Sequence, residues 1–527
     1  MPIVSADGLT WTLRLKPGLH YAPPLDQVQI KAQDVIRALE REANPQASAG
    51  GYSFYFSVIQ GFDDYAAGKA DSISGLEAPD DTTLRIHLVH PAGDLGERLS
   101  LPAAAPIPPN PFDAGAIFGV ATGHDDADGG FLVATGPYML QGSQSLDFST
   151  PPSQQRPASG FVPGRSIVLV RNPSWHASTD ALRGAYVDRI EIATGGTRED
   201  AAAAVDAGRS DLVFDPGPPP QAPDEQIRAY QSDPSKGTIS IEPRDFIRYV
   251  AMNLAAPPLD DIHVRKAMNL VLDKARLQEI RGGPTATEAI GHIALNSLEN
   301  NLLLNYDPYA TPGDAGSVDA SRKEMSLSRY DGNHDGICDA PACSGLLALG
   351  LNTSPIFIAQ AKEIRKEMAE IGIRLDLKLV PPDEAFAKLA DPKNHIPLAL
   401  TISWGKDYLN ASNYFVPLFA GTSIGSGAAG NYTLVGATPE QLRSWGYQVT
   451  NVPGVDDRVD ACLIQLGEAQ LRCWADLDQY LMQDVVPWIP YQSDSHVQVI
   501  PGRIVRYSYD QFADLPALDQ IALQPGT

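Results

Sequence analysis

The chain has 527 residues, which is too long for one hydrophobic core, so two or three domains are expected. Hydrophobic residues make up 43% of it and charged residues 20%, which is typical of a folded globular protein. The 40 Lys and Arg residues are outnumbered by 64 Asp and Glu residues, and the net charge of -24 argues against nucleic acid or anionic lipid as a partner. No apolar run of about 18 residues is present, so we expect no segment that spans a bilayer.

The start of the chain and its cysteines predict different compartments. Met1–Val4 leads directly into a strand-like segment, without the basic start and apolar stretch of a signal peptide, which predicts a cytoplasmic protein. The four cysteines form two locally spaced pairs, Cys338 with Cys343 and Cys462 with Cys473, which predicts two small disulfide loops. Because cytosolic proteins rarely keep disulfides, these pairs indicate export. Four unrelated buried thiols are the alternative, and no further pair of ligands completes a zinc site.

The first half of the chain predicts one strand and one helix, separated by polar loops. Apolar residues alternate over Leu9–Leu15, which predicts a strand, and a turn follows at Pro17 and Gly18. Apolar residues then recur at helical spacing over Ile30–Glu40. Three stretches rich in Pro, Gly, Asp, Ser or Gln are predicted to be loops or linkers, at residues 101–130, 141–164 and 214–224.

The segment 346–404 has the most regular pattern in the chain. A short apolar run, an amphipathic helix closed by Gly372, an alternating strand, a second helix and a buried strand follow one another. This β-α-β-α-β order predicts a parallel sheet covered by helices, in which ligands bind beyond the carboxyl ends of the strands. For the last strand, that position is residues 403–408. The predicted elements are 346–351, 357–371, 373–379, 382–389 and 396–403.

Residues 403–408 combine an acid with aromatic side chains. Asp407 stands between Trp404 and Tyr408, directly after the predicted strand. A carboxylate pairs with an ammonium group and an aromatic face adds cation–π attraction, so this turn is a candidate site for a cationic group. The alternative is that Asp407 caps a helix.

Gly421–Gly425 matches the pattern of a nucleophile elbow, with Ser423 as the nucleophile. An elbow needs a strand before it and a helix after it, but a glycine- and alanine-rich stretch follows at 426–430. The histidine would have to be His496, on an unrelated segment. We therefore favour a flexible loop and assign no catalytic residue. A secreted serine hydrolase is the alternative from a different functional class.

Residues 331–339 resemble the start of a calcium-binding loop. Oxygen ligands at alternate positions suit a hard cation, and Gly336 permits the turn. Ala342 stands where an EF-hand has its bidentate glutamate. A polar turn held by a Cys338–Cys343 disulfide is the favoured alternative, and either role would be structural, so no cofactor is required for function. The candidate calcium ligands are Asp331, Asn333, Asp335, the carbonyl of Ile337, and Asp339.

Seven short motifs follow one another along the chain. The opening segment Asp7–Gly18 continues through Ala32–Val35, and Trp404–Tyr408 has the form Trp-x-x-Asp-Tyr. Together the motifs resemble the signature blocks of the family 5 extracellular solute-binding proteins, which are the peptide- and nickel-type binding proteins of ABC importers. The other motifs lie at 135–138, 168–173, 203–212, 253–274 and 486–491.

The resemblance implies an α/β fold with two lobes. This fold is periplasmic-binding-protein-like, of type II and similar to cluster C, with an extra small α+β domain. The small domain is expected at 1–133, lobe one at 134–247 with 496–527, and lobe two at 248–495. Family members carry an export signal and further residues ahead of their signature, so the N-terminal part of the first lobe is expected to be missing from this chain.

The resemblance also implies a function, which is capture of a peptide or similar amine-bearing solute between the lobes without any chemical reaction. Asp407 would hold the α-amino group of the ligand. Ser403 and Gly405 would supply backbone hydrogen bonds to a peptide bound as an added strand. Trp404 and Tyr408 would form walls. Asn410 and Ala411 replace the Asp-Pro of many members, which is expected to alter the loop after the site.

The implied partners are a peptide or small solute and the permease subunits of an ABC transporter. The protein is expected to be a monomer on the periplasmic or outer face of the cell membrane, held there only by a permease or by a lipid anchor missing from this chain. The same fold with a nickel chelate, a sugar or glutathione as ligand is an alternative, as is a sensor or chaperone without a transporter. Arg265 and Asp273, within the motif at 253–274, are expected to set helix packing.

Overall fold

The computed structural model describes residues 2–47, 52–125, 128–215, 221–425, 430–511 and 513–525. Within these ranges, no helix combines the length and the apolar character that crossing a membrane requires. Parts of two predicted loops, 126–127 and 216–220, lie outside the described residues. The chain divides into two compact units: unit 1 comprises 1–216, 223–239 and 499–527, and unit 2 comprises 217–222 and 240–498. The expected boundary near residue 133 stays a prediction.

The first sheet of unit 1 contains the predicted N-terminal strand. β2 (Thr10–Arg14) pairs antiparallel with β4 (Thr83–His87), in a sheet of order β1-β2-β4-β3. Trp11 is buried, because alternate residues of a strand point to one face. The predicted helix after it is α1 (Ala32–Ala43), which begins after Lys31, whose backbone N–H donates to Asp34 Oδ2 at 2.9 Å.

The second sheet of unit 1 has β7 at its centre, paired antiparallel with three neighbouring strands. The described parts of the predicted loops at 101–130 and 141–164 contain short 3-10 helices. The remaining elements of unit 1 are β1 (Ile3–Val4), α2 (Phe62–Ala66), β3 (Leu76–Asp80), α3 (Leu95–Arg98), β5 (Tyr138–Leu140), β6 (Phe161–Val162), β7 (Ser166–Arg171), β8 (Arg189–Ala193), α4 (Arg198–Asp206), α5 (Asp224–Ser232), β15 (Ile504–Arg506), β16 (Tyr509–Asp510), β17 (Leu515–Pro516) and β18 (Ala522–Leu523).

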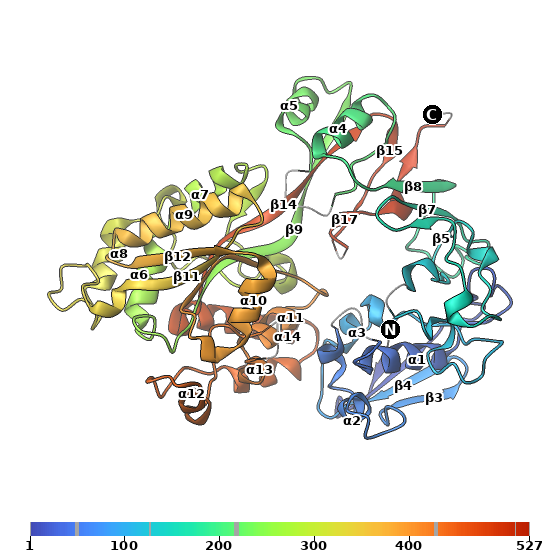
Figure 1. The fold of residues 1–527 in the computed structure, drawn as a ribbon, viewed down its shortest axis with the longest axis horizontal. Helices are drawn as coiled ribbons and strands as arrows, with labels where there is room; N and C mark the ends of the chain where they lie inside the picture. The colour runs from blue at the N-terminus through green and yellow to red at the C-terminus, as the bar shows by residue number, and fades with distance from the viewer. Residues whose placement is uncertain are drawn as a thin grey trace. The chain divides into compact units, whose positions relative to one another are not determined.

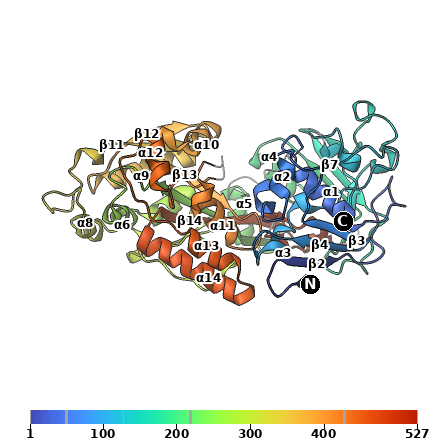
Figure 2. The ribbon, with the colours of Figure 1, turned by 90° about the horizontal axis from the view of Figure 1, so that it is seen from below.

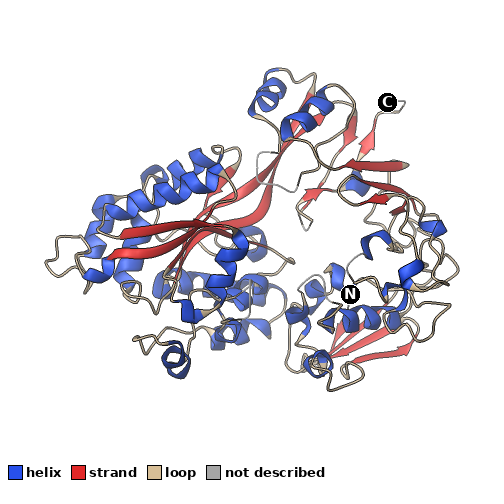
Figure 3. Cartoon of the chain, in the orientation of Figure 1, coloured by secondary structure: helices blue, strands red, loops and turns tan. Residues whose placement is uncertain are grey.

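Unit 2 is built on a six-stranded sheet of order β10-β14-β9-β13-β11-β12, with helices on both faces (Figures 1 and 3). The predicted β-α-β-α-β segment becomes β11 (Ser344–Leu351), α9 (Pro355–Ala369), β12 (Arg374–Val380), α10 (Pro382–Ala390) and β13 (Leu398–Gly405). As predicted, β11 is parallel to β12 and to β13. The six-stranded sheet as a whole is mixed, because β13 is antiparallel to β9. Periodicity within a strand does not determine which strand lies beside it.

Helices cover this sheet, and the core of unit 2 contains buried residues of helices, strands and loops. α9 packs on β11, β12 and β13 and lies beside α7 (Figure 1). The buried ring of Tyr249 stacks on Trp488, with centroids 3.4 Å apart. The remaining elements of unit 2 are β9 (Gly237–Met252) and β14 (Trp488–Pro501), whose ends belong to unit 1, together with α6 (Ile262–Val271), α7 (Lys274–Arg281), β10 (Thr287–Ala289), α8 (Val318–Met325), α11 (Ser412–Phe419), α12 (Pro439–Trp445), α13 (Asp456–Leu463) and α14 (Gly467–Tyr480).

Both predicted disulfides are confirmed. Cys338 and Cys343 are joined with their Cα atoms 5.9 Å apart, and their loop leads directly into β11. Cys462 and Cys473 are joined with their Cα atoms 5.3 Å apart and connect α13 to α14, which lie side by side (Figure 2). Each disulfide therefore closes a short local loop, as the sequence spacing predicts.

The packing roles expected for Arg265 and Asp273 are also confirmed. Arg265 is buried in α6 and its guanidinium donates to the carbonyl of Val485 at 2.8 Å. Burial lowers the pKa of Arg265 to about 10. Asp273 is the N-cap of α7, where its side chain accepts the backbone N–H of Arg276 at 2.7 Å.

Glu367 of α9 is a buried acid whose ionisation opposes folding. Its Oε2 accepts the backbone N–H of Asp273 at 3.0 Å, and burial raises its pKa to about 8. The stability that the protonated carboxyl contributes is complete below its ordinary pKa of 4.5 and is lost as the pH rises through about 8. We expect Glu367→Gln to raise Tm at about pH 9 by about 2–4 °C, and to leave Tm at about pH 4 unchanged.

Calorimetry at the two pH values checks this prediction. The matched control is Glu384→Gln on α10, an exposed glutamate that pairs with Lys388. An equal shift for Glu367→Gln at both pH values would contradict the role of ionisation.

Candidate functional site

The candidate site is the turn of residues 403–408, which we name the Trp404 turn. It lies where the sequence placed it, at the carboxyl end of β13. The strand is buried through Ile402 and becomes half-buried from Ser403 onward. Asp407 does not cap the helix that follows, because the N-cap of α11 is Ala411. The capping alternative for Asp407 was therefore wrong for this helix.

β13 continues past the end of its pairing with β11. That pairing covers Leu398–Leu400, whereas the pairing with β9 extends to Gly405. The change occurs at Thr401, which has a φ of 58° and accepts the backbone N–H of Leu351 on its Oγ1 at 3.3 Å. Among the described strands, β9 is therefore the one that pairs with residues 402–405, and the β11 side of this segment forms an edge.

The backbone groups of the Trp404 turn face alternately toward and away from β9. Lys406 donates its N–H to the carbonyl of Asp245 at 3.3 Å, which continues the ladder. In an antiparallel ladder, hydrogen-bonded pairs alternate with non-hydrogen-bonded pairs. The backbone N–H and C=O groups of Trp404 therefore point toward β9, like the N–H of Lys406. Ser403 and Gly405 direct their N–H and C=O groups to the other side, where β11 has ended.

Asn413 in the first turn of α11 holds the Trp404 turn in place. Its Oδ1 accepts the backbone N–H of Asp407 at 3.1 Å, and its Nδ2 donates to the carbonyl of Tyr408 at 2.8 Å. The carbonyl of Asn413 accepts the indole N–H of Trp404 at 3.0 Å. One residue thus fixes both the indole and the acidic end of the turn. Nothing in the sequence indicated this role beyond an amide at the start of a helix.

A buried ion pair lies directly beneath the turn. Lys406 Nζ contacts Asp245 Oδ2, and the two side chains are only 3% and 2% exposed. Asp245 Oδ1 also accepts the hydroxyl of Ser297 at 3.1 Å. A buried pair of this kind fixes geometry more than it adds stability, because both ions lose their hydration. This ion pair was not predicted from the sequence, because its members are 161 residues apart.

The structure brings the five predicted site residues together in one turn but exposes them unequally. Ser403, Trp404, Gly405 and Asp407 are half-buried, whereas Tyr408 is 1% exposed. The hydroxyl of Tyr408 lies 3.0 Å from Ser412 Oγ, so this ring supports the turn. Its expected role as a ligand wall, like the ligand contacts of the other four residues, stays a prediction.

Comparison with known proteins identifies the family. The model of the bacterial extracellular solute-binding proteins, family 5, matches residues 3–426. The chain belongs to this family. Membership explains the motifs along the chain, of which the Trp404 turn is one.

Two relatives that are similar in sequence are named for glutathione. The glutathione-binding protein GsiB of Pectobacterium atrosepticum is 25% identical over 306 residues, which are 58% of this chain and 48% of that protein. The protein of the same name from Escherichia coli K12 is 25% identical over 288 residues, which are 55% of this chain and 45% of that protein. The match therefore spans about half the length of these relatives.

Solved structures of similar proteins confirm the predicted fold. Clavulanic acid biosynthesis oligopeptide binding protein 2 has a TM-score of 0.75 and 23% identity, and the match covers 99% of this chain and 85% of that one. The Escherichia coli murein tripeptide binding protein MppA has a TM-score of 0.65 and 17% identity, and the match covers 99% and 88%. This family 5 chain has the α/β fold of the two-lobed periplasmic peptide-binding proteins.

The loop proposed for calcium uses its acidic side chains to hold its own backbone. Asp331 is buried and its Oδ2 accepts the N–H of Gly336 at 2.7 Å. Asp335 Oδ1 accepts the N–H of Ile337 at 2.9 Å, and Asp339 Oδ1 accepts the N–H of Gly332 at 3.2 Å. Asn333 Nδ2 donates to Asp335 Oδ2 at 3.0 Å. These bonds suit the polar turn, and calcium binding here stays a prediction.

The environment of Ser423 differs from that of a nucleophile elbow. Ser423 ends a short 3-10 helix (Gly421–Ser423) that directly follows α11, so a helix stands where an elbow needs a strand. Its hydroxyl donates to the carbonyl of Val416 at 2.9 Å. Most of the stretch predicted to be a loop, 426–429, lies outside the described residues. The serine hydrolase alternative therefore lacks the strand that a nucleophile elbow needs before its serine.

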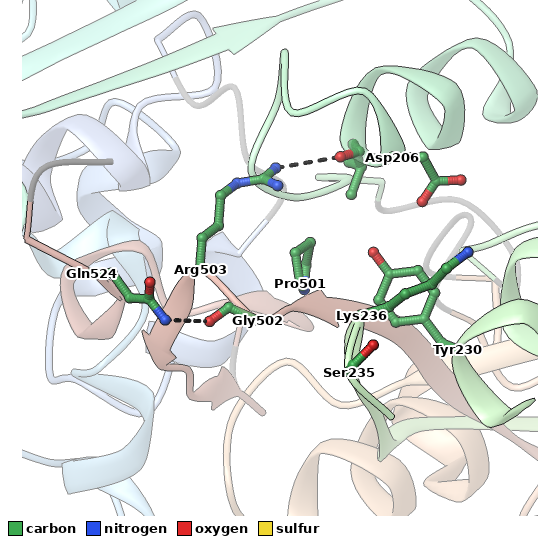
Figure 4. Close-up of a pocket in the computed structure, with 9 residues that line it drawn as sticks. Asp206, Tyr230, Ser235, Lys236, Pro501, Gly502, Arg503 and Gln524 are labelled. Atoms are coloured by element: carbon green, nitrogen blue, oxygen red, sulfur yellow. Dashed lines mark hydrogen bonds between the residues drawn. The ribbon is translucent and has the colours of Figure 1, made fainter. Parts of the chain in front are cut away.

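Unit 1 contains a separate polar cavity of about 500 Å³ (Figure 4). Tyr230 and Lys236 line one side, and Arg503 and Gln524 line the other. Arg503 is held by Asp211, with Nε 2.7 Å from Oδ1, and Gln524 donates to the carbonyl of Gly502 at 3.0 Å. Its lining includes no residue of the Trp404 turn, and its polar groups hold neighbouring parts of unit 1 together.

Proposed function

We propose that this family 5 chain is the solute-capture subunit of an ABC importer on the outer face of the cell membrane. Its ligands are peptides or similar solutes with a free amino group. The observation that carries the proposal is the edge of β13, where Ser403 and Gly405 direct backbone groups away from β9, beside Asp407. Family membership and the peptide-binding proteins that share the fold support it.

The geometry of the turn gives each part a role in capture. An extended peptide lies along the β11 side of residues 402–405 and adds its main-chain hydrogen bonds to those of the sheet. The Asp407 carboxylate pairs with the terminal ammonium, while the Trp404 indole limits the site on one side. Because these contacts involve only the main chain and the amino terminus of the peptide, the site accepts peptides with many different side chains. Asn413 and the Lys406–Asp245 pair hold the turn ready before binding.

Isothermal titration calorimetry with a short peptide, free and N-acetylated, tests this function. We expect the free peptide to bind and acetylation to weaken binding at least about tenfold, because it removes the ammonium charge. Equal affinity for the two forms would overturn the amine site. Native mass spectrometry of the freshly purified protein, which is expected to show a retained peptide, identifies the natural ligand. Binding of neither form, in protein free of retained ligand, would overturn peptide capture.

Glutathione is a second candidate ligand, favoured by the names of the relatives found by sequence. It also carries a free α-amino group, so the same Asp407 contact would hold it. Its γ-linked glutamate places the first peptide bond farther from the ammonium than in an ordinary tripeptide. A titration of glutathione against trialanine therefore discriminates the two ligands, since one spacing between Asp407 and the strand edge cannot suit both equally.

A further inference from the structure

Three buried side chains of unit 2 converge outside the Trp404 turn. His292, Glu299 and Asp478 each place a ligand atom within 4.8 Å of the other two. Among the described residues, this is the one group of three or more His, Cys, Asp or Glu side chains that does so. All three side chains are enclosed by the protein, with Glu299 and Asp478 completely buried. None of the three residues belongs to a motif that the sequence indicated.

Three different elements supply these side chains. His292 follows β10, Glu299 ends the short helix Asn296–Glu299, and Asp478 lies near the end of α14. Asp478 is already oriented by backbone groups, because Oδ1 accepts the N–H of Ile293 at 2.9 Å and Oδ2 accepts that of Ala294 at 2.7 Å. His292 Nδ1 lies 3.3 Å from Asp478 Oδ2. The backbone bonds from Ile293 and Ala294 to Asp478 are of the kind that holds a metal-binding carboxylate in place from outside the ligand shell.

Glu299 provides the second, independent observation. Both of its carboxylate oxygens are enclosed without a hydrogen-bond partner. Burial, and then the charge of Asp478, raise the pKa of Glu299 well above its ordinary value. A carboxyl group with two unsatisfied oxygens beside a second carboxylate is costly in a protein interior. A bound dication satisfies Glu299 and neutralises both carboxylates at the same position.

We propose that His292, Glu299 and Asp478 form a buried site for one transition-metal dication of the zinc class. An imidazole nitrogen with two carboxylate oxygens suits Zn²⁺ better than Ca²⁺ or Mg²⁺, which prefer all-oxygen ligands in larger number. The metal would tie segment 292–299 to α14. Ser297 in that segment donates to Asp245, the partner of Lys406, so the site supports the Trp404 turn. The proposal does not depend on the identity of the solute.

The test is zinc retention by the full chain. Protein dialysed against EDTA is incubated with ZnCl₂, passed over a gel-filtration column and analysed by elemental mass spectrometry. We expect about one zinc per chain in the wild type and at least about tenfold less in Glu299→Gln, which keeps the side-chain shape and removes a ligand charge. The matched control is Glu288→Gln on β10, an exposed acid four residues from His292, which should retain zinc like the wild type.

A second measurement keeps the proposal falsifiable if Glu299→Gln folds poorly. Zn²⁺ is expected to raise Tm of the stripped wild type and of Glu288→Gln, and Co²⁺ in its place is expected to give visible absorption bands. Folded, stripped wild type that retains no zinc and shows no Tm shift would overturn the proposal, since Glu299 would then simply hold a proton. Equal zinc retention by wild type and Glu299→Gln would also overturn it.

Discussion

Replacing Asp494 with alanine is expected to lower the free energy of unfolding by about 3–5 kcal/mol, because it leaves two buried guanidinium groups without their counter-ion. Asp494 of β14 is only 2% exposed, and its Oδ2 lies 2.9 Å from Arg248 Nη2 and 2.6 Å from Arg281 Nη2. Both guanidiniums also lie over the ring of Phe357, at 4.7 and 5.3 Å from its centroid. The aromatic ring cannot replace a full negative charge.

The pH dependence of this effect has a definite sign. Burial alone would raise the pKa of Asp494, but the charges of Arg248 and Arg281 outweigh it and lower that pKa from 3.8 to about 2. The stability contributed by the ionised carboxylate is therefore complete above pH 3.8 and is lost as the pH falls through about 2. The difference in the free energy of unfolding between wild type and Asp494→Ala should therefore be largest at neutral pH and shrink below about pH 4.

Urea denaturation at about pH 7 and about pH 3 measures both the loss of stability and its dependence on pH. The matched control is Asp376→Ala on β12, where an exposed acid lies 3.8 Å from Lys378 and a loss within about 0.5 kcal/mol is expected. A loss for Asp494→Ala no larger than that of the control would contradict the view that this acid holds the two arginines.

The parts of this fold that the sequence predicted are those encoded by neighbouring residues. The alternation and helical spacing of 346–404 produced β11, α9, β12, α10 and β13 within a few residues of their predicted bounds, because burial of one face sets a local period. The two disulfides join cysteines that are 5 and 11 positions apart in the sequence, so their pairing was visible as well. The Trp404 turn was found by combining strand periodicity with a family motif.

Contacts between distant segments could not be predicted in the same way. The Lys406–Asp245 pair and the Asp494–Arg248 pair join residues that are 161 and 246 positions apart. Either acid could equally have been a surface residue, because a single charged residue in a strand carries no periodic signal. The edge of β13 depends on where β11 ends beside it, which is a property of the assembled sheet. The sequence therefore located the Trp404 turn, but not the contacts with distant segments that hold it in place.

Asp407→Ala is expected to raise the Kd for a peptide with a free amino terminus about 30- to 1000-fold, which corresponds to about 2–4 kcal/mol. The loss is large because the ligand ammonium would be removed from water without a counter-ion. The same variant should bind an N-acetylated peptide as the wild type does, since that ligand brings no charge to the position. Isothermal titration calorimetry with the two peptides gives both Kd values.

Asp376→Ala is again the appropriate control, because it changes the net charge of the chain by the same amount from a strand of the same unit. It separates a local contact from the long-range attraction that an acidic protein exerts on any cation, which salt screens over about 10 Å. Equal weakening of free and acetylated peptides by Asp407→Ala would mean that the Asp407 side chain only shapes the turn and does not contact the ligand ammonium. Selective loss of the free-amino peptide, with Tm unchanged, would instead require a direct contact between the Asp407 carboxylate and the ligand ammonium.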